Sequence, residues 1–179
     1  MRQIVTAALV VVLCVAASVA GGSGPGSPAK STAAANQYKA LLKAYEEEED
    51  AREFAGRFLQ LALDHPKDAV AVDSLCWIAI HVTRGTELGR ALVLLKQQHL
   101  SSKKLAPVCE ALERKSSLPS EELLRSALAK NPHRNVRTQA CFSLARFLQQ
   151  KVTLRSKLAV QPELKPRFEQ FYGKDFTRL

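Results

Sequence analysis

The chain has 179 residues, of which 46% are hydrophobic, 24% are charged and 6% are aromatic, with 26 Lys and Arg against 17 Asp and Glu. This length suits one domain or two small ones. With only 8 Gly, 8 Pro and 4 Cys, the composition disfavours a turn-rich β-sandwich or barrel and excludes a disulfide scaffold, a collagen and a polytopic membrane protein.

The first twenty residues are predicted to be a secretory signal peptide. Met1-Arg2 gives a positive start, residues 4–17 are almost all apolar, and Ser18-Val19-Ala20 places small residues before a cleavage site. The alternative is an uncleaved anchor, because residues 4–20 reach the lower limit of length for crossing a bilayer about 30 Å thick. We therefore expect a protein exported to the periplasm or cell envelope, with membrane contact only if this segment is retained.

Residues 21–35 are predicted to be a flexible linker, because the run consists mainly of Gly, Ser, Pro and Ala and has no side chain large enough to bury. A helical-repeat domain is then expected over residues 36–175, followed by a short C-terminal tail of residues 176–179. A segment of this length can enclose one modest hydrophobic core.

A period of about 34 residues organises this domain. Two sets of residues recur at this period: His65, His99 and His133 at steps of 34, and Cys76, Cys109 and Cys141 at steps of 33 and 32. Agreement of several sets on one period is typical of stacked structural repeats, in which each unit buries its apolar face against the next.

The apolar spacing within each unit is helical. Apolar residues fall on one helix face in residues 68–82 and again in residues 87–99, and Thr83-Arg84-Gly85 separates the two segments. This hairpin resembles a tetratricopeptide repeat (TPR). The residues at the packing positions of that repeat are Leu75, Ile78, Ala79, Val82, Ala91 and Leu95.

The third unit is similar to another repeat family. After His133, the residues Val136-Arg137, Ala140 and Leu144 follow the spacing of a HEAT-repeat helix. TPR and HEAT proteins are both α-solenoids. We therefore expect an all-α protein, a right-handed α-solenoid-like stack of about three helical hairpins of the TPR or HEAT kind.

The remaining segments are also predicted to be helices, and no β-sheet is expected. Residues 36–63 form a long helix kinked near Asp50, and residues 103–115 form a short one. Pro119, followed by two glutamates, starts another helix. Residues 162–172 make the last one, which Gly173 ends.

Three cysteines remain after cleavage of the signal peptide, an odd number for an oxidising compartment. Equivalent positions on stacked helices lie about 8 to 10 Å apart, whereas a disulfide needs Cα atoms within about 7 Å. Each cysteine also has apolar neighbours, which favours buried small hydrophobes over a redox role. No Cys-x-x-Cys pair is present, so the chain alone is not expected to perform thioredoxin-type chemistry.

The histidines and the acidic run Glu46–Asp50 are expected to have structural roles. Histidines at the ends of successive repeats lie along one edge and cannot converge on a metal ion, and His81 is expected to be a satisfied helix residue. Consecutive helix residues point about 100° apart, so the five acids are predicted to form a solvated face. No catalytic, cofactor-binding or metal-binding residue is predicted, and the protein is not expected to be an enzyme.

Positive charge is concentrated in the second part of the chain. Residues 1–75 carry 7 basic and 9 acidic side chains, net −2, whereas residues 76–179 carry 19 and 8, net +11. This indicates either a solvated basic face or a surface for an acidic protein. Nucleic acid is not expected as a partner, because the chain is predicted to be exported and has few aromatic residues on which bases could stack.

An ordered series of short motifs runs through residues 38–175. It includes His65-Pro66-Lys67-Asp68, Leu75-Cys76-Trp77, Ser102-Lys103-Lys104-Leu105, Pro107-Val108-Cys109, Asn131-Pro132-His133-Arg134, Gln139-Ala140-Cys141 and Phe171-Tyr172-Gly173-Lys174-Asp175. The series resembles the helical N-terminal region of exported redoxin-domain proteins of the planctomycete TlpA-like type. In that family a thioredoxin-like domain follows and carries the thiol chemistry. The resemblance implies a truncated member or a stand-alone paralogue, and no catalytic cysteine carries over.

Two functions from different classes follow. The first is a non-enzymatic, exported helical-repeat protein that presents an interaction surface to a protein partner, either an acidic protein or a redoxin. The alternative is an accessory of envelope thiol-disulfide exchange, which acts with a separate redoxin or through one exposed cysteine. Three unreactive thiols would favour the first function, and one fast thiol the second.

Overall fold

A computed structural model describes residues 28–48, 50–115 and 117–172 of the chain. Within these ranges every regular element is a helix, so the prediction of an all-α protein without a β-sheet is confirmed there. The predicted signal peptide and C-terminal tail, and residues 21–27 of the predicted linker, lie outside the described residues. None of the described helices combines the length and apolar composition needed to cross a bilayer.

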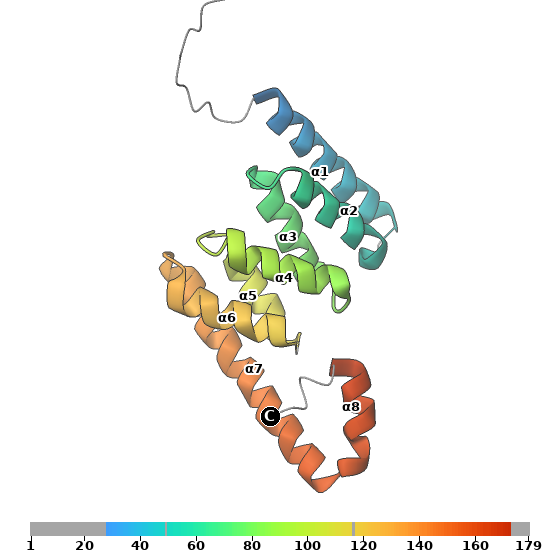
Figure 1. The fold of residues 1–179 in the computed structure, drawn as a ribbon, viewed down its shortest axis with the longest axis vertical. Helices are drawn as coiled ribbons and strands as arrows, with labels where there is room; N and C mark the ends of the chain where they lie inside the picture. Colours follow the sequence, from blue (N-terminus) through green and yellow to red (C-terminus); the bar gives the residue numbers. More distant parts are fainter. Residues whose placement is uncertain (1–27, 49, 116, 173–179) are drawn as a thin grey trace, which may run out of the picture.

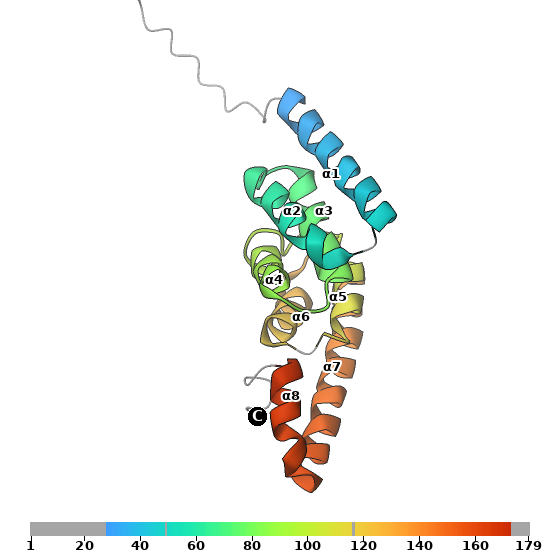
Figure 2. The ribbon, with the colours of Figure 1, turned by 90° about the vertical axis from the view of Figure 1, so that its right-hand side faces the viewer.

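The helices lie in two rows (Figures 1 and 2). In chain order they are α1 (Pro28–Glu48), α2 (Ala51–Asp64), α3 (Ala69–His81), α4 (Thr86–Gln98), α5 (Leu105–Leu112), α6 (Leu118–Lys130), α7 (Arg134–Val160), the 3-10 helix η1 (Pro162–Leu164) and α8 (Lys165–Tyr172). One row is made by contacts of α1 with α3, α3 with α5 and α5 with α7, and the other by contacts of α2 with α4 and α4 with α6.

The hydrophobic core lies between the two rows. The six predicted packing positions are all buried, each with 2% or less of its surface exposed. The largest side chains with less than 2% of their surface exposed are Phe54, Phe58 and Phe147, which belong to α2 and α7. Burial of apolar surface contributes about 25 cal/mol per Å², so this continuous core is the main source of stability.

The long helix expected over residues 36–63 is in fact two helices. Asp50 separates them, because its extended backbone starts α2 as an N-cap and its carboxylate accepts the Arg52 N–H at 2.9 Å. α1 begins earlier than expected, so residues 28–35 are helical and do not belong to a flexible linker. Pro28 suits the first turn of a helix, and the alanines that follow have the highest helix propensity.

An aromatic cluster joins α1 to α2 and α3. Trp77 stacks between Phe58 and His81, with ring centroids 4.0 and 4.8 Å away. From α1, Tyr45 meets the Trp77 ring edge-on at 4.9 Å and Tyr38 meets Phe58 at 5.6 Å. Edge-on and offset pairs of this kind add to the stabilisation from burial alone. The cluster therefore holds the first helix against the rest of the protein.

Asn131 connects two turns at one end of the helices. Its side-chain Nδ2 donates hydrogen bonds to the carbonyls of Leu100, at 2.6 Å, and Ser102, at 3.1 Å, and its Oδ1 accepts the His133 N–H at 2.8 Å. The residue is 2% exposed. It thereby fixes the turn between α4 and α5 to the turn between α6 and α7.

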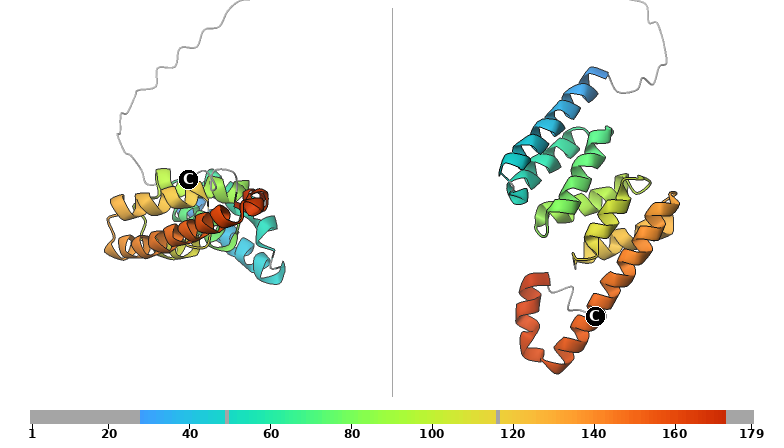
Figure 3. Two further views of the ribbon diagram at one scale, coloured as in Figure 1. Left: turned by 90° about the horizontal axis from the view of Figure 1, so that it is seen from below. Right: turned by 180° about the vertical axis from the view of Figure 1, so that it is seen from behind.

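The C-terminal part of the fold extends away from the array. α6 begins as expected, with Ser117 as its N-cap and Pro119 in the first turn. α7 has 27 residues, about 40 Å of helix, and its second half projects beyond α5 and α6 (Figure 1). The predicted last helix starts as η1 at Pro162, which reverses the chain so that α8 runs back toward the array (Figure 3).

Candidate functional site

The three cysteines that the structure describes lie on successive helices of one row, α3, α5 and α7. Cys76 and Cys109 are buried, Cys141 is exposed, and all three are free thiols. Burial raises the pKa of Cys76 and of Cys109 to about 12, so both stay protonated and poorly nucleophilic at neutral pH. The prediction of buried small hydrophobes is confirmed for these two residues and is wrong for Cys141.

The exposure of Cys141 follows from its place at the end of the row. Cys76, the eighth residue of α3, faces the turn that leads into α5, with its Sγ 3.9 Å from the Lys104 carbonyl oxygen. Cys141 is likewise the eighth residue of its helix, but in the described part of the chain no following unit covers it. The sequence period groups Cys141 with Cys76 and Cys109 without indicating which of the described helices ends the row.

The exposed side of α7 carries apolar side chains next to polar ones such as Thr138 and Gln149. We call the surface formed by Cys141, Phe142, Ala145 and Val152 the outer face of α7; all four residues are exposed. Phe142 is 67% and Val152 is 65% exposed, whereas Phe147 on the inner side of the same helix is 1% exposed. Large apolar side chains grouped on a surface are typical of contact sites. The outer face is therefore the candidate functional site.

Positive charge surrounds the outer face. α7 contains six Lys and Arg residues and no Asp or Glu. Three of the six are held from within the protein: Arg137 donates to the Asn131 carbonyl at 2.8 Å, Arg146 to Glu113 at 3.2 Å and Lys151 to Glu121 at 2.8 Å. The other three, Arg134, Arg155 and Lys157, are exposed. An anionic partner would therefore gain electrostatic attraction from Arg134 at the start of the helix and from Arg155 and Lys157 near its end.

The three periodic histidines lie at the ends of helices. His65 ends α2, His99 ends α4 and His133 precedes α7. The His65 Nδ1 lies 3.7 Å from the Asp68 carboxylate, whereas burial lowers the pKa of His99 and its Nε2 has no hydrogen-bond partner. Among the residues that the structure describes, no three His, Cys, Asp or Glu side chains are grouped as metal ligands.

Two other candidates from the sequence have structural roles. His81 places its Nδ1 3.0 Å from the Trp77 carbonyl and stacks on the Trp77 ring, which confirms a satisfied helix histidine. Residues 46–48 are exposed at the end of α1, and Asp50 caps α2. The prediction of a solvated acidic face is thus confirmed for the described residues of this run.

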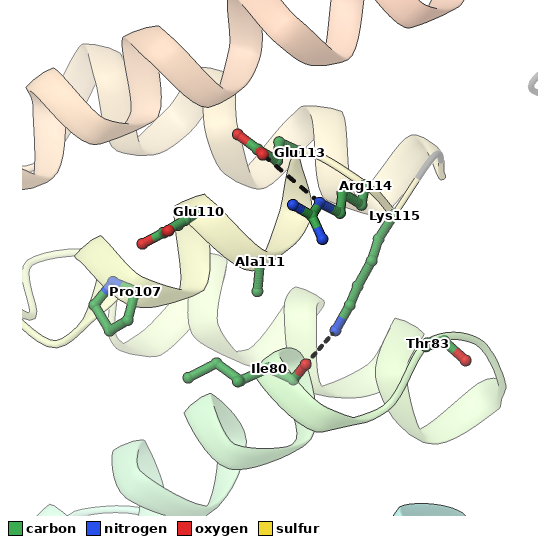
Figure 4. Close-up of a pocket in the computed structure, with 8 residues that line it drawn as sticks. All are labelled: Ile80, Thr83, Pro107, Glu110, Ala111, Glu113, Arg114 and Lys115. Carbon is green, nitrogen blue, oxygen red and sulfur yellow. Dashed lines mark hydrogen bonds and ion pairs between the residues drawn. The ribbon is translucent and has the colours of Figure 1, made fainter.

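A hollow of about 510 Å³ lies between the end of α3 and α5 (Figure 4). Its lining residues are Ile80, Thr83, Pro107, Glu110, Ala111, Glu113, Arg114 and Lys115. The Lys115 side chain crosses the hollow and donates hydrogen bonds to the carbonyls of Ala79 and, at 2.9 Å, Ile80. Burial lowers the pKa of Lys115 to about 8.

The contacts of Lys115 indicate what this amine does. Both of its acceptors belong to the last turn of α3, where unsatisfied carbonyls and the helix dipole favour a cation. Lys115 therefore satisfies carbonyls at the end of that helix, while the burial that lowers its pKa opposes the charged form of the amine. Sequence reasoning missed this residue, because Lys115 lies 35 residues from Ile80 and a contact between separate helices leaves no periodic signal.

Comparisons with models of known protein families, with curated proteins and with solved structures found no match for this chain. The fold defines the class, an all-α protein whose described helices lie in two rows. Its function has to be inferred from the surfaces described above.

Proposed function

We propose that the chain is a non-enzymatic helical-repeat protein that presents an interaction surface to a protein partner. The proposal includes a right-handed, solenoid-like stack of about three hairpins: α1 with α2, α3 with α4 and α5 with α6. The alternation of helices between two rows and the core between them support this arrangement. The apolar, uncharged segment at residues 4–20 supports export to the periplasm or cell envelope.

The observation that carries the proposal is the exposure of Phe142 and Val152 on the outer face of α7. A phenylalanine buries about 150 to 250 Å² when it is covered, so an uncovered one beside further apolar residues favours association. The hollow at Lys115 supports an enzyme less well, because its amine is engaged by backbone carbonyls of α3.

The proposal can be tested by photo-crosslinking in living cells. A benzophenone amino acid at position 145 lies within the outer face, and the same group at the exposed Gln60 of α2 serves as the control. We expect position 145 to form an adduct with one protein that position 60 does not form. Phe142→Ser, combined with the probe at 145, should reduce that adduct at least about tenfold. Identical adducts from both positions, or none from either, would contradict the proposal.

A second function is favoured by the exposure of Cys141. An accessory of thiol-disulfide exchange needs one accessible thiol, and Cys141 is the exposed one of the three described cysteines. Because Cys141 is exposed, its thiol reacts whichever of the two functions is correct. The test is therefore how fast this thiol reacts. A redox role predicts reaction with an aromatic disulfide at neutral pH at least about tenfold faster than that of a simple peptide thiol. A rate equal to the peptide's favours the interaction protein.

A further inference from the structure

The outer face of α7 occupies a defined position in the row of odd-numbered helices. α3 contacts both α1 and α5 in this row, and α5 contacts both α3 and α7. α7 contacts α5 on its inner side, and its opposite side is the exposed outer face. Within the described ranges, the next position of the row, beyond α7, is therefore open.

The outer face has the shape that a neighbouring helix requires. Cys141, Ala145 and Val152 are separated by 4 and 7 residues, so they return to the same side of the helix. Ala145 lies between the larger Phe142 and Val152, and a small residue between larger ones lets the ridge of another helix approach closely. The position equivalent to Cys141 is buried in α3, so the same part of a helix is already used for packing inside the array.

The charge of α7 restricts what can occupy this position. All six charged side chains of the helix are basic. A second copy docking through its own α7 would bring two positive helices together. The outer side of α1 in a second copy exposes Lys39, Lys43 and the glutamates 46–48 but no large apolar side chain that could cover Phe142. A negatively charged helix from another protein meets neither obstacle.

We propose that the outer face of α7 binds an acidic amphipathic helix of a partner protein, which takes the next position in the row. The partner helix lays apolar side chains over Phe142, Ala145 and Val152 and directs Asp or Glu toward Arg155 and the other basic residues of α7. This inference rests on the proposed function and specifies the chemistry of the partner.

Two matched synthetic helices of about 20 residues provide the test. Both carry Leu at helical spacing on one side; one has Glu on its flanks and the other has Lys. Binding to the full chain is measured by fluorescence anisotropy at physiological salt. We expect the acidic peptide to bind at least about tenfold more tightly than the basic one, and this preference to weaken as salt rises.

Substitutions locate the site. Phe142→Asp should reduce binding of the acidic peptide about tenfold or more, and Arg155→Glu about three- to tenfold. The matched controls are Leu63→Asp on α2 and Arg90→Glu on α4, which make the same changes at exposed positions of the other row; they should leave binding unchanged. Circular dichroism of each variant establishes that it is folded.

Three outcomes would overturn the inference. The first is equal binding of both peptides, and the second is loss of binding in the control variants. The third is binding to vesicles rich in anionic lipid that depends on Phe142, without binding to the acidic peptide, which would make the outer face a membrane contact. If crosslinking at position 145 captures a protein through a surface that is not acidic, the proposed function stands and this inference fails.

Discussion

α1 and α7 end the same row of helices, yet they expose different surfaces. The outer side of α1 exposes Lys39, Lys43 and residues 46–48 together with small alanines, whereas α7 exposes Phe142 and Val152. A polar outer side keeps the end of a stack of helices soluble. The outer side of α1 is of this polar kind, whereas the outer side of α7 is partly apolar.

The two ends are also attached differently. α1 is held by the rings of Tyr38 and Tyr45 against those of α2 and α3. α7 adds to its apolar contacts a series of polar links, among them the pair of Lys151 with Glu121, whose side chains are 13% and 12% exposed. Substitutions that remove packed side chains should therefore destabilise the N-terminal end most. Substitutions that remove hydrogen bonds should destabilise the C-terminal end most.

The largest expected contrast is in thiol reactivity. Cys141 should react with a maleimide at the rate of an exposed thiol, whereas Cys76 and Cys109 react only when the structure opens, at least about 10³-fold more slowly. Mass spectrometry of the native protein over time measures this contrast, with the unfolded protein as the reference. In Cys141→Ser the fast labelling at position 141 should vanish. Fast labelling of Cys76 or Cys109 in the native wild type would contradict the buried assignment.

Truncating aromatic rings should distinguish the inner cluster from the outer face. Phe58→Ala removes a fully buried ring and should lower the free energy of unfolding by about 3 to 5 kcal/mol. Phe142→Ala should change it by about 0.5 kcal/mol or less, because that ring is mostly in solvent. Urea unfolding followed by circular dichroism measures both. Similar losses for the two variants would mean that Phe142 is already covered.

Removal of the Asn131 amide should weaken the C-terminal end. Asn131→Ala leaves the carbonyls of Leu100 and Ser102 without this donor in a buried setting, and should cost about 2 kcal/mol of unfolding free energy. Asn135→Ala, at an exposed position in the first turn of α7, is the control and should cost far less. Hydrogen exchange should speed up in α6 and α7 of the first variant before α1 and α2 are affected.

The smallest effect concerns pH. The pKa of Lys115 is about 8 in the folded protein and about 10.4 for an unfolded lysine, so between these pH values the unfolded chain binds more protons. The free energy of unfolding of the wild type should therefore rise relative to Lys115→Met between pH 7 and pH 10, on the order of 1 kcal/mol because the amine is partly exposed.

The exposed Lys103→Met is the control for this measurement and should leave the pH dependence of the wild type unchanged. Cys76 and Cys109 make the free energy of unfolding fall as the pH rises, opposite to the effect of Lys115. Both variants keep these thiols, so their contribution cancels in the difference between wild type and Lys115→Met. The folded-state pKa of each thiol is raised, so the stability they contribute is lost as the pH rises toward 12. If the difference in free energy of unfolding between wild type and Lys115→Met does not change with pH, the amine is as well solvated in the folded protein as in the unfolded chain.

The sequence predicted the features that depend on the spacing of neighbouring residues, namely buried helix positions and helix starts. The period of apolar residues identified Leu75, Ile78 and Ala91 as buried, and Pro119 marked the start of α6 close to its observed position. Near Asp50 the sequence predicted a kink, where the structure has the end of one helix and the start of another. These features depend on residues within one or two helical turns.

The sequence did not predict what depends on the order of the helices in space. Cys141 has the same local pattern as Cys76, and only its place at the end of a row exposes it. Lys115 and Asn131 act on carbonyls about 30 residues away, and no local pattern reports such a contact. Residues 28–35 were misassigned because an alanine-rich run is compatible with a linker and with a helix, and here α1 includes it.

The protein has a single tryptophan, and Trp77 lies in the aromatic cluster where the first three helices meet. Its fluorescence therefore reports on the surroundings of this cluster alone. Detachment of α1 would remove the Tyr45 ring from the indole and change the signal, whereas fraying of α7 would leave it untouched. Fluorescence and circular dichroism recorded on the same sample would thus follow the two ends of the molecule separately, without any label.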